Sequence, residues 1–172
     1  MKSLIEANAA KLRDLHQEIK RTWLKRGQDE KSTEAWTNAC REFHHSYDAL
    51  AFPGGLGRAM SLLPQNDHET IEQSVRFLEA DPFYFRSGYI KTDIIKHLRR
   101  MPLHESQKKR LQKVIINRIY DKARREFRWY CRLAKYVTDP EFEQQLVELS
   151  AAGTPKFVSM QAKWVLAQLK PS

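Results

Sequence analysis

The sequence predicts an all-α protein with about eight helices joined as antiparallel hairpins. Apolar residues recur at steps of three and four over most of the 172 residues. The 6 glycines and 7 prolines fall between these stretches, where they break helices, and no segment alternates with a period of two. Because a chain of this length buries enough surface to fold unaided, we expect residues 1–172 to form a single helical domain.

The first two predicted helices, near 3–26 and 32–51, form an N-terminal hairpin over residues 1–51. Each repeats its apolar residues at steps of three or four, which gives it one buried face. Gly27 is a natural stop between them, and Ser32 or Thr33 is the expected N-cap of the second helix.

Capping signals and chain breaks divide the remainder of the sequence into further helices. Asn66 is an expected N-cap, and Asp81-Pro82, Asp139-Pro140 and Thr154-Pro155 each offer a capping oxygen followed by proline. A helix running from 104 to 137 would be unusually long, so we place a turn near 120–125. The predicted helices lie near 67–80, 82–100, 104–120, 124–137, 140–152 and 155–169. Their short connections predict antiparallel neighbours.

Residues 67–169 resemble a HEAT-like α-solenoid. Asp-Pro pairs at helix starts, aliphatic spacing within the helices and successive hairpins are features of that family. The resemblance implies a short stack of helical pairs that presents a groove or flank to another macromolecule. The sequence does not repeat with a regular period of about 40 residues, so an irregular helical bundle stays open as the alternative fold.

The positive charge of the chain is concentrated in one segment. The formal net charge is +9. Residues 99–135 contain 13 Lys and Arg against 3 Asp and Glu, whereas residues 1–98 are balanced at 14 against 14. Clustered cations attract polyanions and steer their approach, although a charged face can also be merely solvated. The segment therefore predicts a basic surface for an anionic partner.

The predicted helix near 124–137 separates its cations from its apolar residues. Phe127 and Tyr130 belong to the apolar stripe, while the cations recur at steps of four, four and three on another face. Trp129 lies among the cations and could stack on a base, or it could pack against a neighbouring helix. The predicted partner-binding residues are Lys109, Lys113, Arg124, Arg128, Arg132 and Lys135.

Other chemical motifs are incomplete. The glycine-rich segment 52–58 lacks the lysine and serine of a phosphate-binding loop, which favours a linker between helices. Cys40 and His44 lie one helical turn apart, but a zinc site needs two further ligands. We therefore expect no metal and no cofactor. An enzyme with an unrecognised site stays an alternative, and its first candidate residues are Glu79, Asp81, Arg86 and Tyr89.

These observations predict a non-enzymatic interaction module of the cytoplasm. The start of the sequence lacks the apolar core of a signal peptide, no apolar run suits a membrane span, and Cys40 and Cys131 read as free thiols of a reducing compartment. An adaptor or a stoichiometric inhibitor, such as an immunity protein, fits a small helical domain. We expect an acidic protein as the first candidate partner and nucleic acid as the alternative.

Overall fold

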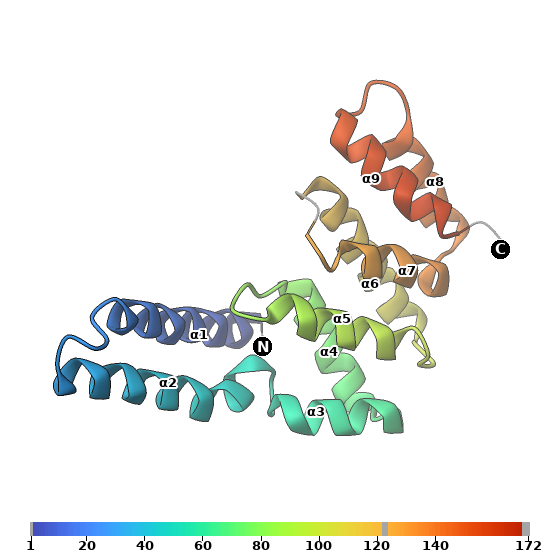
Figure 1. The fold of residues 1–172 in the computed structure, drawn as a ribbon. Helices are drawn as coiled ribbons and strands as arrows, with labels where there is room; N and C mark the ends of the chain where they lie inside the picture. The colour runs from blue at the N-terminus through green and yellow to red at the C-terminus, as the bar shows by residue number, and fades with distance from the viewer. Residues whose placement is uncertain (1, 122–123, 170–172) are drawn as a thin grey trace. The chain divides into compact units, whose positions relative to one another are not determined.

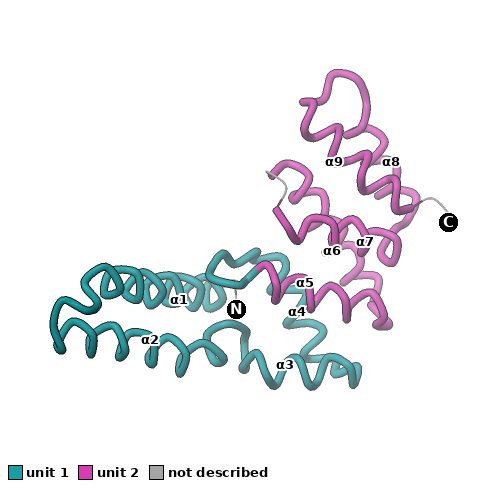
Figure 2. The backbone as a smooth tube through the Cα atoms, in the orientation of Figure 1, with its two compact units in different colours: residues 1–87 teal, residues 88–172 magenta. Residues whose placement is uncertain are grey.

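The computed structural model describes residues 2–121 and 124–169, and the chain forms two compact units (Figure 2). Unit 1 spans residues 1–87 and unit 2 spans residues 88–172. Each unit has its own set of buried apolar side chains. The border falls within the range 67–169 that the sequence assigns to one helical stack.

The predicted all-α fold is confirmed, because every regular element in the described residues is helical (Figure 1). This part of the chain contains nine α-helices, one more than predicted, and none is long and apolar enough to cross a bilayer. The elements are α1 (Lys2–Trp23), α2 (Glu30–Ala51), α3 (Leu56–Leu62), a 3₁₀ turn (Leu63–Gln65), α4 (His68–Ala80), α5 (Ser87–Leu98), α6 (Glu105–Tyr120), α7 (Phe127–Val137), α8 (Pro140–Ser150) and α9 (Lys156–Ala167). The HEAT-like resemblance stays a prediction.

Unit 1 is built on a long antiparallel hairpin of α1 and α2 (Figure 1). Leu12 of α1 and Phe43 of α2 are buried, as their apolar spacing predicts. Asp29 caps α2: its carboxylate accepts from the Ser32 backbone N–H at 2.6 Å, and the Ser32 hydroxyl accepts from the Asp29 N–H at 3.2 Å. The predicted cap, Ser32, is therefore the third residue of the helix.

Asn66 and Asp81 lie at the ends of helical elements rather than at the predicted starts. Asn66 has a φ of 59° and ends the 3₁₀ turn, while Asp67 caps α4 by accepting from the Thr70 N–H at 2.8 Å. Asp81, with a φ of 44°, ends α4 rather than starting the next helix. Asn and Asp tolerate this left-handed backbone better than most residues, so the same side chains serve helix ends as well as helix starts.

The aromatic segment after Asp81 forms a loop that delays the start of α5 until Ser87. Long-range hydrogen bonds tie this loop to the hairpin of unit 1. Arg13 donates to the Phe83 carbonyl at 2.8 Å, and the hydroxyl of Tyr47 donates to the Phe85 carbonyl at 3.0 Å. Buried Tyr84 donates to the Ala51 carbonyl. These hydrogen bonds join residues that are far apart in the sequence. Local propensity does not include them, so it predicts a helix from residue 82.

Unit 2 pairs α6 with α7 and α8 with α9, and α7 also contacts α9. Asp139-Pro140 starts α8 as predicted, with the Asp139 carboxylate accepting from the Phe142 N–H at 2.9 Å. Pro155, in contrast, precedes α9 and no side chain caps that helix. The predicted break near 120–125 is confirmed, because α6 ends at Tyr120 and α7 begins at Phe127, although residues 122–123 of this range lie outside the described residues.

Candidate functional site

Two helices of unit 2 carry stripes of basic and aromatic side chains that touch one another. In the stripe of α7 and its start, Arg125, Trp129, Arg132 and Tyr136 are spaced by four, three and four residues, so they share one side of the helix. Arg128 lies beside Trp129. We call this surface the α5–α7 face. Its members are Tyr89, Lys96 and Arg99 from α5 and its end, and Arg125, Arg128, Trp129, Arg132 and Tyr136 from α7 and its start.

Trp129 lies at the centre of the face with three cations around its ring. The guanidinium of Arg132 is 4.6 Å from the ring centroid, the Lys96 ammonium is 5.1 Å away, and the Arg128 guanidinium is 5.8 Å away. Cations within about 6 Å of an indole are attracted by its ring quadrupole. The half-buried tryptophan thus packs against the neighbouring helix and supports the cations.

Arginine–tyrosine pairs flank Trp129 on both sides. Arg125 donates to the Tyr89 hydroxyl, and its guanidinium is 4.8 Å from that ring. Arg99 donates to the Tyr136 hydroxyl at 3.1 Å, which lowers the pKa of Tyr136 because the bond stabilises the phenolate. Tyr89, near the start of α5, contacts Arg125, just before α7. Arg99, just after the end of α5, contacts Tyr136, near the end of α7. The two helices therefore run side by side in the same direction.

A buried ion pair joins the two helices beneath this face. The Lys91 ammonium is fully buried and lies 3.8 Å from a carboxylate oxygen of buried Glu126. A Cβ on Gly88 would lie 3.0 Å from the other oxygen. The glycine that the sequence places inside a helix is therefore explained by the close approach of a carboxylate. Leaving either charge buried without its partner would be costly, so the pair holds α5 and α7 in register.

The three arginines that α7 and its start contribute to the face keep their positive charge unneutralised. Within residues 2–121 and 124–169, no carboxylate forms an ion pair with Arg125, Arg128 or Arg132. Lys96 differs, because Asp93 lies 2.8 Å from its ammonium. Aromatic rings orient a guanidinium without cancelling its charge. The face can therefore attract anions through arginines that are already positioned.

The predicted basic residues of α7 and its start are exposed, whereas Lys109 of α6 pairs with two carboxylates. Arg124, Arg128, Arg132 and Lys135 are all exposed. The Lys109 ammonium lies 2.5 Å from Glu141 and 3.2 Å from Asp139, and these bonds raise its pKa. Two carboxylates thus cancel the charge that the sequence analysis assigned to the shared patch.

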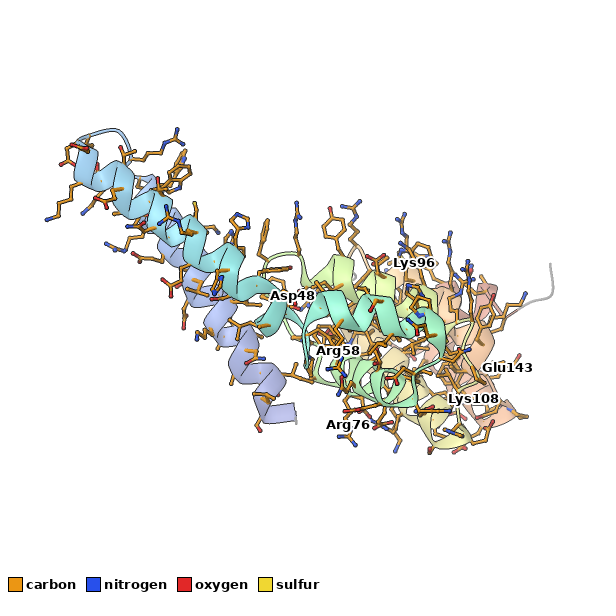
Figure 3. The ribbon with its side chains drawn as sticks, turned by 90° about the horizontal axis from the view of Figure 1, so that it is seen from below. Asp48, Arg58, Arg76, Lys96, Lys108 and Glu143 are labelled. Atoms are coloured by element: carbon orange, nitrogen blue, oxygen red, sulfur yellow. The ribbon has the colours of Figure 1, made fainter. Side chains whose placement is uncertain are left out.

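The other lysines of α6, Lys108 and Lys113, are not members of the α5–α7 face. Lys108 pairs with Glu105 at 2.5 Å. In Figure 3, Lys96 lies toward the upper edge of unit 2 and Lys108 toward its lower edge. Lys113 is exposed, and in the described residues no hydrogen bond or ion pair links it to α7. Carboxylates therefore pair with Lys108 and Lys109 of α6, and the single patch over residues 99–135 stays a prediction.

The glycine-rich loop of unit 1 already holds an anion, the carboxylate of Asp48. The Gly57 N–H donates to Asp48 at 2.7 Å (Figure 3). Added Cβ atoms at Gly55 and Gly57 would lie 3.0 and 3.2 Å from its oxygens. The start of α3 is thus satisfied by the chain itself, and this arrangement favours the interpretation of the loop as a linker over a phosphate site.

The residues considered for catalysis are not gathered into a buried site. Glu79, Arg86 and Tyr89 are exposed, and Asp81 is only partly buried. No group of three or more His, Cys, Asp or Glu that could bind a metal occurs in the part of the chain that the structure describes. Tyr89 instead belongs to the α5–α7 face.

Sequence reasoning missed the contribution of α5 and the aromatic partners of the cations. The spacing of Arg125, Trp129, Arg132 and Tyr136 is visible in the sequence, and it signals a single side of a helix. What the sequence does not show is that α5 lies parallel to α7. Compared with known proteins, the chain matches no family model, no curated protein and no solved structure.

Proposed function

We propose that this chain is a non-enzymatic binding module that captures the phosphate backbone of nucleic acid on the α5–α7 face. The observation that supports the proposal is the set of arginines held against aromatic rings without an acidic partner in the described residues. An arginine stacked on a ring still presents N–H donors at the edge of its guanidinium, and those donors match phosphate oxygens. Neutralising phosphates releases counterions and drives binding.

An acidic protein, the partner that the sequence analysis placed first, would be attracted by the same charges. The alternation of rings and cations favours nucleic acid, because interfaces that bind single strands combine a cationic track with aromatic stacking groups. Parallel helices of a HEAT-like stack would present such a track as a continuous flank.

The experiment is a fluorescence-anisotropy titration of labelled single- and double-stranded oligonucleotides at about 50 and 200 mM salt. The test variant replaces four exposed cations of unit 2 with alanine: Arg124, Arg128, Arg132 and Lys135. The matched control removes the same number of charges from unit 1 by replacing exposed Lys11, Lys20, Lys25 and Lys31 with alanine.

We expect wild-type binding to weaken with salt, the test variant to lose it and the control to keep most of it. Thermal unfolding of all three proteins checks that the test variant is folded. An absence of binding at low salt, or equal losses in the two variants, would overturn the proposal. Affinity capture of an acidic protein at fixed stoichiometry would then be the better account.

A further inference from the structure

A groove of about 410 Å³ lies between α7 and α9. Its lining combines arginines with aromatic side chains. The arginines that matter here are Arg125, Arg128 and Arg132, from α7 and its start. The aromatic residues are Phe127 of α7 and Trp164 of α9. The volume falls within the range of about 300–1,000 Å³ that is usual for small-molecule sites.

Trp164 is anchored and still accessible. Its ring lies 6.3 Å from that of Phe127 at an interplanar angle of 52°, while 47 % of the residue's surface is exposed. A tryptophan that is held against another ring and remains half exposed can accept a further planar group. Nucleobases stack on such side chains regardless of sequence, because every base has a π face.

The charged side chains in the described lining of the groove are all positive. Its described lining contains no aspartate or glutamate. Cys131, which also lines the groove, is buried, and burial raises the pKa of its thiol to about 12. The thiol therefore stays neutral at physiological pH and adds no negative charge. An anion in the groove meets arginines without a competing acid.

We propose that this groove holds one unpaired nucleotide of a single strand, with the base on Trp164 and the phosphate on Arg128 and Arg132. This inference rests on the proposed function and adds a preference for single strands to it. A base in a duplex is stacked between its neighbours and paired, so it cannot reach Trp164 without being extruded. The same arginines border both the groove and the α5–α7 face, so the backbone can lie on the face while one base enters the groove.

The test compares Trp164→Ala with Phe157→Ala in the titration with single-stranded and duplex oligonucleotides. Phe157 is a matched control, because it is on the same helix, is also 47 % exposed and does not line the groove. Loss of one stacked base weakens binding by about 5- to 100-fold. We expect that loss for the single strand in Trp164→Ala, near-wild-type duplex binding, and recovery of most of the affinity in Trp164→Phe.

Equal affinities of the two alanine variants for the single strand would overturn this inference while leaving the proposed function intact. A loss in Trp164→Ala that is as large for the duplex as for the single strand would also overturn it, since a folding or backbone effect would then explain both. If the wild-type protein binds neither oligonucleotide, the proposed function itself fails, and the groove assignment fails with it.

Discussion

The lysines of α6 and the arginines of α7 belong to the same basic segment, yet their charges have different partners. Lys108 and Lys109 lie 2.5 Å from the carboxylates of Glu105 and Glu141. Arg128 and Arg132 instead lie 5.8 and 4.6 Å from the centre of the Trp129 ring. A carboxylate orients and neutralises a cation, whereas a ring only orients it. The number of cations in a segment therefore overstates the charge that is available for binding. Cations paired with carboxylates are neutralised, whereas cations packed on rings are not.

The largest expected effect concerns the ion pair that holds the arginine face in place. Replacing Lys91 with methionine leaves Glu126 buried without its partner, and we expect the free energy of unfolding to fall by roughly 3–5 kcal/mol. Urea denaturation measures this change. The double variant Lys91→Met/Glu126→Leu should recover most of the loss. A single variant as stable as wild type would show that the pair does not fix the register of α5 and α7.

The next effect tests the comparison directly with two charge-matched double variants. Arg128→Ala/Arg132→Ala should weaken nucleic-acid binding about tenfold or more at low salt, because two phosphate contacts are removed. The affinity of Lys108→Ala/Lys109→Ala should stay within about twofold of the wild-type affinity, since carboxylates already cancel the charges of the two lysines. Anisotropy titrations of both proteins measure the difference. Equal losses would mean that only the total charge of the segment matters.

A smaller effect isolates the contribution of the ring. Trp129→Leu keeps every cation of the face but removes the surface that orients three of them. We expect affinity to fall by about 3- to 5-fold, which corresponds to one cation–π contact of somewhat less than 1 kcal/mol. The dependence of the binding constant on salt should stay unchanged, because the charges remain. A variant that binds as tightly as wild type would reduce Trp129 to a packing residue.

The smallest effect is the pH dependence of stability that arises from Asp139, the N-cap of α8 and a partner of Lys109. Hydrogen bonds from Gln112 and from the Phe142 N–H lower the pKa of Asp139 from 3.8 to about 2. A lowered folded-state pKa contributes stability that is present above about pH 4 and is lost as the pH falls through 2. Asp139→Ala should lower Tm by about 2–4 °C at pH 7, since a helix cap is lost.

Calorimetry across the pH range checks the Asp139 prediction. The difference in Tm between wild type and Asp139→Ala should shrink as the pH falls from 4 toward 2, because the wild-type carboxylate becomes protonated. Asp139 is not a member of the α5–α7 face, so nucleic-acid binding should not depend on this carboxylate. A difference in Tm that is constant with pH would mean that Asp139 acts through its shape alone.

Local features of the fold could be predicted from the sequence, and contacts between distant segments could not. The helical class, the break before α7 and the cap at Asp139 depend on neighbouring residues, and all three are confirmed. The late start of α5 depends on hydrogen bonds across 38 and 70 residues, from Tyr47 and Arg13 to the loop after Asp81. The partner of each cation is likewise a tertiary property.

The parallel alignment of α5 and α7 also gives the arginine face a definite length. Tyr89 and Arg99 mark its two ends and are ten residues apart, which corresponds to about 15 Å along a helix. Successive phosphates of a stacked strand are about 3.4 Å apart along the axis, so the face matches four or five of them. The footprint of one molecule is therefore short. Lengthening an oligonucleotide beyond that footprint should recruit additional copies of the protein, so its stoichiometry should rise in steps.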